Sequence, residues 1–173
     1  MSKWTLIPPE GCSPSSASCT SEPEHPLLLR PSAVLFACTE NAIRSPMAEG
    51  ILKHLAGRRI FVDSAGVRAG EVDSFAVQAM DEIGIDICRH RPKSFDDLED
   101  ESFDLVISLS PEAQHRAVEL TRAMACEVIF WNTFDPSIIE GSRETRLDAY
   151  RNVRDQLFAR IRAQFGPAMM AGL

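Results

Sequence analysis

The chain has 173 residues, of which 45% are hydrophobic, and this length and composition suit one domain with a buried core. Its formal net charge of −7 argues against nucleic acid or an anionic membrane as a partner. Five cysteines, an odd number in a chain without a recognisable secretion signal, indicate a reducing compartment, so a cytoplasmic location is expected.

The first part of the chain differs in composition from the rest. Residues 1–31 contain six of the 11 prolines and many serines, and their apolar residues follow no helical or strand period. Such a segment buries too little apolar surface to offset the entropy that ordering would cost. We therefore predict that residues 1–30 are a disordered N-terminal extension and that residues 31–173 form one folded domain.

Beyond that point, short apolar runs alternate with longer amphipathic stretches. Strands are predicted at 33–37, 60–63, 105–109 and 127–131, and helices at 46–56, 74–83, 111–122 and 142–165. Strands that alternate with helices favour an α/β fold, in which helices cover both faces of a parallel sheet. We expect a single three-layer domain with a four-stranded parallel sheet.

The first and last predicted helices carry the clearest apolar patterns. Met47, Ile51 and Leu55 recur every four residues in the first helix, and Gly57 follows as its end. The last helix has one apolar stripe, made of Leu147, Tyr150, Val153, Leu157 and Ile161. Both patterns predict amphipathic helices that pack against the sheet.

The connection between the first strand and the first helix indicates the chemistry. Cys38 follows the strand, and five residues separate it from Arg44, which gives the pattern Cys-x5-Arg. Ser45 is predicted as the N-cap of the next helix and Pro46 as its first helical residue. A thiol attacks phosphorus as a thiolate, which needs positive charge nearby: a helix N-terminus, inward N–H groups or a cation. The same groups bind the oxygens of a phosphoryl group. A buried structural cysteine is the simpler alternative.

Several blocks of residues strengthen the first interpretation by occurring in one order along the chain. They are Cys38 to Glu49 (CTENAIRSPMAE), Val62 to Gly66, Gly84 to Asp86 followed by His90 to Ser94, Phe103 to Ile107, and Asp135-Pro136. With these blocks, the sequence from about residue 33 to residue 165 resembles the low-molecular-weight protein tyrosine phosphatase family. That family includes a branch of thiol-dependent arsenate reductases. The resemblance implies that the strand order in the sheet is 2-1-3-4.

The resemblance also implies catalytic roles. Cys38 would be the nucleophile that forms a phosphocysteine, and Arg44 would bind the phosphoryl oxygens. Asp135 would be the general acid that protonates the leaving oxygen, and then the base that activates water. The loop residues that would surround the substrate are Thr39, Glu40, Asn41, Ala42, Ile43, Arg44 and Ser45.

Three residues would support this site without taking part in bond making. Asn41 would hold the loop in its shape, Ser45 would stabilise the thiolate, and Ser64 would hydrogen-bond the loop from outside. We therefore expect a cysteine-dependent phosphatase for phosphotyrosine or a related aryl phosphate, with no cofactor and no metal. Its partners would be a phosphorylated protein or a small aryl phosphate and phosphate-like anions, and it would be a monomer or weak dimer.

The sequence departs from the family's usual pattern at positions that keep other functions open. Glu40 stands where phosphatases usually have glycine, and Ser110 lies near the place of the first relay cysteine of the reductases. Ser137 and Ile138 replace two tyrosines that commonly flank an aromatic substrate. The alternatives are an arsenate reductase that uses an external thiol, and a phosphate- or phosphoprotein-binding module with little turnover.

Other residues are expected to be structural. Cys88 and Cys126 are interpreted as buried thiols, and the basic cluster at 89–93 as a solvated connection. Trp131 and Phe134 are interpreted as core residues, with an aromatic wall for the substrate as the alternative. None of the four histidines stands at a spacing typical of metal sites from other residues that could be ligands.

Overall fold

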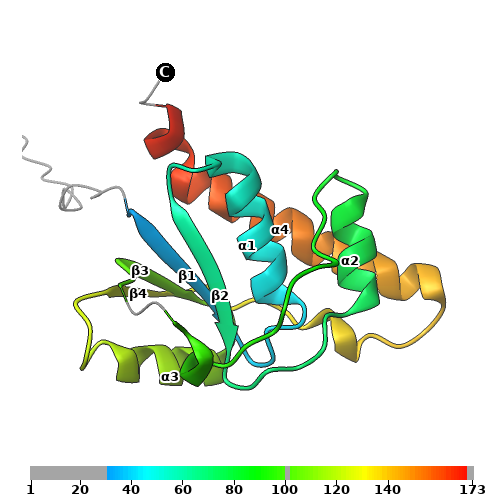
Figure 1. The fold of residues 1–173 in the computed structure, drawn as a ribbon. Helices are drawn as coiled ribbons and strands as arrows, with labels where there is room; N and C mark the ends of the chain where they lie inside the picture. The colour runs from blue at the N-terminus through cyan, green and yellow to red at the C-terminus, as the bar shows by residue number, and fades with distance from the viewer. Residues whose placement is uncertain (1–30, 100–101, 171–173) are drawn as a thin grey trace, which may run out of the picture.

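The computed structural model of the protein describes residues 31–99 and 102–170 (Figure 1). The extension predicted at 1–30 lies outside these described residues. A four-stranded parallel sheet forms the centre, with strands β1 (Ala33–Cys38), β2 (Phe61–Gly66), β3 (Leu105–Ser108) and β4 (Glu127–Phe130). Its strand order is β2-β1-β3-β4, which confirms the predicted 2-1-3-4 arrangement.

Helices cover the sheet on both faces, so the predicted three-layer α/β fold is confirmed (Figure 1). Helices α1 (Arg44–Ala56), α2 (Ser74–Asp81) and α4 (Arg143–Met170) lie on one side. Helix α3 (Pro111–Leu120) and the short 3-10 helix η1 (Phe95–Asp97) lie on the other. A second 3-10 helix, η2 (Pro136–Ile138), follows β4.

The central strand β1 explains why both layers are needed. All six of its residues are buried. Val34 and Phe36 point into the core beneath α1 and α4, whereas Leu35 and Ala37 point into the core beneath α3. Because side chains alternate along a strand, an uninterrupted apolar run has to be covered from both sides.

The predicted apolar stripe of the last helix is confirmed. Leu147, Tyr150, Val153, Leu157 and Ile161 are each at most 1% exposed. Helix α1 ends at Ala56 and Gly57 follows as its C-cap, as predicted; this glycine adopts a positive φ of 59° and donates its N–H to the Lys53 carbonyl.

Several predicted boundaries and burial assignments are wrong. Helix α4 ends at Met170 and not near 165, and β2 continues to Gly66, so that Ser64 lies inside the strand. Cys88 is exposed and Cys126 is half-buried, because neither lies on a strand or on a helix face that packs against the sheet. Phe134 is 48% exposed and is therefore no core residue.

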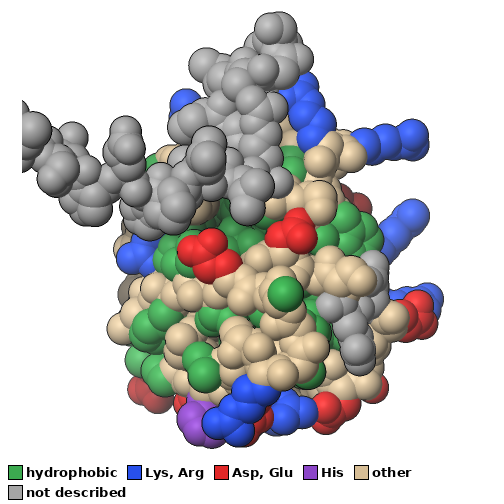
Figure 2. Space-filling view, turned by 90° about the vertical axis from the view of Figure 1, so that its left-hand side faces the viewer, with side chains coloured by type: hydrophobic (Ala, Val, Ile, Leu, Met, Phe, Trp, Pro, Cys, Tyr) green, Lys and Arg blue, Asp and Glu red, His purple; other side chains and the backbone are tan. Residues whose placement is uncertain are grey.

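None of the helices in the described part of the chain is long and apolar enough to cross a membrane. On the face that Figure 2 shows, apolar and uncharged side chains cover most of the described surface, and Lys and Arg side chains stand toward its margins.

Candidate active site

The site lies at the carboxyl ends of the strands, where Cys38 ends β1 and the chain turns into α1. We call residues 38–45 the phosphate loop. Ser110 follows β3 and caps α3, and Asp135 follows β4 and caps η2. Open parallel sheets bind ligands beyond these ends, beside the point where the strand order reverses.

The phosphate loop is hydrogen-bonded along its outer side to the segment that follows β2. The four bonds are Val67 N to Cys38 O (3.1 Å), Arg68 N to Thr39 O (3.0 Å), Gly70 N to Glu40 O (2.8 Å) and Asp73 N to Ala42 O (3.1 Å). Because these carbonyls turn outward, the amide groups lie toward the inside of the loop, and the Asn41 N–H donates to the Cys38 Sγ at 3.2 Å. Such inward amides form an anion-binding concavity.

Gly66 makes this close approach of the two segments possible. A Cβ atom at this position would lie 2.4 Å from the Arg68 carbonyl oxygen and 2.7 Å from the Asn41 nitrogen. Both neighbours are backbone atoms, which cannot move aside cheaply. The glycine of the Ser64-Ala65-Gly66 block is thus required by the packing of the loop.

Asn41 is the residue around which the loop folds. It has a positive φ of 53°, which asparagine tolerates better than most residues, and it is fully buried. Its Nδ2 donates to Ser45 Oγ (2.9 Å) and Ser64 Oγ (2.8 Å). Its Oδ1 accepts from the backbone N–H of Lys93 at 3.0 Å. A backbone N–H can only donate, so this bond fixes which end of the amide is oxygen.

The direction of these bonds determines where the two serine protons point. Each hydroxyl accepts from Asn41 and keeps one proton to donate. The Ser64 proton goes to the Glu49 carboxylate. The Ser45 hydroxyl lies 2.9 Å from the Cys38 Sγ, whereas its other acceptor, the Ala65 carbonyl, is 3.5 Å away. The Ser45 proton is therefore directed at the sulfur, where it stabilises a thiolate.

Ser45 is consequently no N-cap, contrary to the prediction. Helix α1 begins at Arg44, and its N-cap Ile43 makes no side-chain hydrogen bond. Ser45 lies inside the first turn, and its hydroxyl bonds to Asn41 and Cys38. The orphan amides that a cap would satisfy stay at the mouth of the loop, where an anion can bind them.

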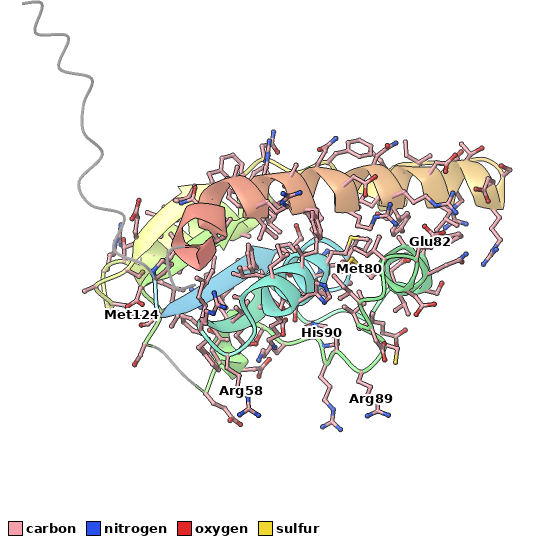
Figure 3. All side chains as sticks on the ribbon, turned by 90° about the horizontal axis from the view of Figure 1, so that it is seen from above. Arg58, Met80, Glu82, Arg89, His90 and Met124 are labelled. Carbon is pink, nitrogen blue, oxygen red and sulfur yellow. The ribbon has the colours of Figure 1, made fainter. Side chains whose placement is uncertain are left out.

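His90 supports the loop from behind, a role that sequence reasoning missed. Its Nε2 lies 3.0 Å from Asn41 Oδ1, and its Nδ1 lies 3.4 Å from the Glu49 carboxylate. Since Asn41 Oδ1 is an acceptor, Nε2 carries a hydrogen. Figure 3 shows His90 lying beneath α1, whereas the neighbouring Arg89 extends into solvent. The cluster at 89–93 is thus only partly a solvated connection.

Arg44 and Asp135 meet across the mouth of the site. Arg44 is 7% exposed and donates to the Thr133 carbonyl (3.1 Å) and to Asp135 Oδ2 (3.0 Å). The other oxygen of Asp135 accepts from the backbone N–H and the hydroxyl of Ser137. These two bonds fix the orientation of the carboxylate at the start of η2. The structure thus places the guanidinium, the carboxylate and the Cys38 loop in one site.

The remaining loop side chains point away from the sulfur. Glu40 forms an exposed ion pair with Arg68 at 2.6 Å, so its carboxylate lies outside the concavity. The positive φ falls on Asn41 and not on Glu40, so the loop does not need glycine at position 40. Ile43 packs against the core and Ala42 is buried, which leaves their backbone for an anion. Thr39 Oγ1 donates to Ser110 Oγ at 3.1 Å.

Trp131 and Phe134, the two candidates for an aromatic wall, differ in their surroundings. Trp131 is partly buried and packs against the core beside Phe36, with ring centroids 6.4 Å apart, so its predicted core position is confirmed only in part. Phe134 and Ile138 are exposed on either side of Asp135. Within the described residues, no three His, Cys, Asp or Glu side chains are grouped to hold a metal ion.

The family of the protein follows from comparison with known proteins. A family model described as low molecular weight phosphotyrosine protein phosphatase matches residues 33–169, and the chain belongs to this family. This confirms the resemblance seen in the sequence blocks.

Three similar proteins differ in the activities that their names state. A curated arsenate reductase of Halalkalibacterium halodurans is 37% identical over 129 residues, 75% of this chain and 91% of the relative. The solved low molecular weight protein tyrosine phosphatase from T. tengcongensis is 32% identical with a TM-score of 0.61, covering 75% of this chain and 94% of the other. The arginine phosphatase YwlE, solved as a mutant with a phosphorylated active-site serine, is 28% identical with a TM-score of 0.63, covering 80% and 95%.

Proposed function

We propose that this protein is a cysteine-dependent phosphatase that hydrolyses phosphotyrosine or a related aryl phosphate through a phosphocysteine. One observation supports this proposal most. The Asp135 carboxylate accepts a hydrogen bond from the Arg44 guanidinium, and both lie in the same site as the Cys38 thiol, at which the Ser45 proton is directed. A thiol and an arginine suffice to bind an oxyanion, and the carboxylate adds the proton that a leaving oxygen needs. A phosphorylated protein or small aryl phosphate in a reducing cytoplasm would be its natural substrate.

In the first step, the Cys38 sulfur attacks phosphorus and the bond from phosphorus to the leaving oxygen breaks. The electron pair of that bond stays on the leaving oxygen, which takes a proton from Asp135. The planar fork of Arg44 binds two equatorial oxygens at once, and the inward loop amides bind the rest. A bound phosphoryl group therefore takes over the Arg44 donors that contact Asp135 and Thr133 in this structure.

In the second step, water attacks the phosphocysteine and gives its proton to Asp135. The sulfur–phosphorus bond breaks, phosphate leaves, and the sulfur returns to a thiolate that the Ser45 hydroxyl and the Asn41 amide stabilise. The phosphorylated serine in the YwlE mutant supports a covalent phosphoenzyme in a relative of this fold.

Arsenate reduction is the second candidate, because the curated relative from H. halodurans is an arsenate reductase. Reduction of arsenate to arsenite takes two electrons, which two thiols supply as they form a disulfide. Cys38 would be one thiol, but the sequence has no cysteine between Cys88 and Cys126. The hydrogen bond to Asp86 raises the pKa of Cys88, and burial raises the pKa of Cys126, so both are poor thiolates. In this candidate the second thiol comes from another molecule, or from Cys12 or Cys19, which lie outside the described residues.

One set of assays separates these candidates. We expect the wild-type protein to hydrolyse an aryl phosphate in a vanadate-sensitive reaction, and Cys38→Ser to be inactive. Cys126→Ser is the matched control, and it should keep full activity. A fully active Cys38→Ser protein would end the proposal. Arsenate-dependent oxidation of glutathione without aryl phosphate hydrolysis would establish the second candidate instead.

A further inference from the structure

Asp73 ties the outer side of the phosphate loop to two helices. Its backbone N–H donates to the Ala42 carbonyl at 3.1 Å, one of the four bonds that turn the loop carbonyls outward. Its Oδ1 accepts from the Phe75 and Ala76 amides as the N-cap of α2. Its Oδ2 accepts from the Tyr150 hydroxyl of α4 at 3.0 Å. The position of Asp73 is thus set from α2 and from α4 together.

Tyr150 reaches Asp73 from within the apolar stripe of α4. Its side chain is fully buried, and its ring packs against Phe75 with centroids 5.4 Å apart. Burial and the charge of Asp73 raise the pKa of the hydroxyl, so Tyr150 stays protonated at any working pH and always donates. The other members of the stripe are aliphatic, and packing alone would be served by a phenylalanine.

We propose that Tyr150 is a positioning residue for the phosphate loop: its hydroxyl holds Asp73, which holds the Ala42 carbonyl outward and the inner amides toward the bound oxyanion. The oxyanion part of this inference rests on the proposed function. Without the hydroxyl, the partly buried Oδ2 of Asp73 loses its donor and the carboxylate can turn away from α4. The Ala42 end of the loop then becomes mobile.

Hydrogen exchange tests the tie itself, whatever the loop binds. In Tyr150→Phe, which keeps the ring, the Asp73 amide should exchange about three- to tenfold faster, the effect of one lost hydrogen bond. The Val67 and Arg68 amides donate to the same loop at Cys38 and Thr39, and their exchange should not change. Unchanged exchange at Asp73, or equal acceleration at all three amides, would overturn the proposal.

Vanadate affinity tests the consequence for the site. Tyr150→Phe should bind vanadate about three- to tenfold more weakly than the wild type. Ile161→Val is the control, because it removes one buried methyl from the same stripe of α4 and lowers stability without touching Asp73. Asp73→Asn should keep most of the affinity, since the new amide can still cap α2 and can donate to the Tyr150 oxygen.

The outcomes separate the two proposals. Equal loss of vanadate affinity in Tyr150→Phe and Ile161→Val would show that Tyr150 only stabilises the fold, and would overturn the positioning role. A wild-type protein that binds no vanadate would contradict the proposed function, and the exchange of the Asp73 amide would still decide whether Tyr150 holds the loop.

Discussion

Replacing Asn41 with aspartate tests the hydrogen-bond directions on which the thiolate argument depends. The two side chains have the same shape, but the Nδ2 that donates to Ser45 and Ser64 becomes an oxygen. The serine protons are already directed at the Cys38 sulfur and the Glu49 carboxylate. One oxygen of the new carboxylate keeps its donors from Lys93 and His90. The other either stays buried without a donor, or the two hydroxyls turn to it and Ser45 leaves the sulfur.

The cost of Asn41→Asp can be approximated from these contacts. Two lost hydrogen bonds contribute about 0.5–1.5 kcal/mol each, and a buried charge with one oxygen left unpaired adds a penalty of similar or larger size. We expect the free energy of unfolding to fall by about 3–5 kcal/mol, out of the roughly 5–15 kcal/mol of a typical domain. The reaction of Cys38 with iodoacetamide at neutral pH should also slow about tenfold or more, because a hydrogen bond to a charged group contributes about 1.5–3 kcal/mol.

Urea unfolding and mass spectrometry of the alkylated Cys38 peptide measure these two effects. Asn152→Asp makes the same chemical change on the exposed side of α4 and serves as the control. An Asn41→Asp protein within about 0.5 kcal/mol of the wild type, the range of ordinary surface substitutions, would refute the reasoning. An unchanged alkylation rate would do the same for the Ser45 contact.

Four further predictions follow from the same contacts. Arg44→Lys loses the planar fork, so vanadate affinity should fall about 100-fold, and a loss below tenfold would contradict the bidentate role. Asp135→Asn should lower kcat for aryl phosphates by about 10²- to 10⁴-fold while phosphocysteine still forms in a rapid-quench experiment; an unchanged kcat would remove the acid role. Glu40→Gly should change turnover less than about threefold, because its pair with Arg68 is exposed, and a large gain would show that the carboxylate opposes the substrate. Folding raises the pKa of Tyr150, so the stability that its protonated hydroxyl contributes is complete below about pH 10 and falls by roughly 1.4 kcal/mol per pH unit above pH 10. The urea midpoints measured near pH 9 and pH 11 should therefore differ more in the wild type than in Tyr150→Phe.

The fold could be predicted from the sequence because its signals are local and repeated. The apolar run of β1 and the stripe of α4 each contain enough residues to show their pattern, and the structure buries the residues of both. The end of α1 was marked by Gly57, whose conformation few other residues adopt. The strand order needed the family resemblance, since hydrophobic period says nothing about which strands are neighbours.

The side-chain contacts of the site could not be predicted in the same way. Ser45 before Pro46 has the pattern of an N-cap, but the nearby Asn41 amide and Cys38 sulfur take its hydroxyl. His90 lies among basic residues that suggest an exposed loop, and its burial arises from contacts with Asn41 and Glu49, which are distant in sequence. Partners of this kind become visible only when separate segments meet in the fold.

A crystal structure with vanadate tests the central claim most directly. We expect the vanadium to lie within bonding distance of the Cys38 sulfur, with two of its oxygens on Arg44 and the others on the amides of the phosphate loop. Vanadate bound elsewhere, or a phosphate loop that stays empty with Glu40 turned into it, would contradict the account.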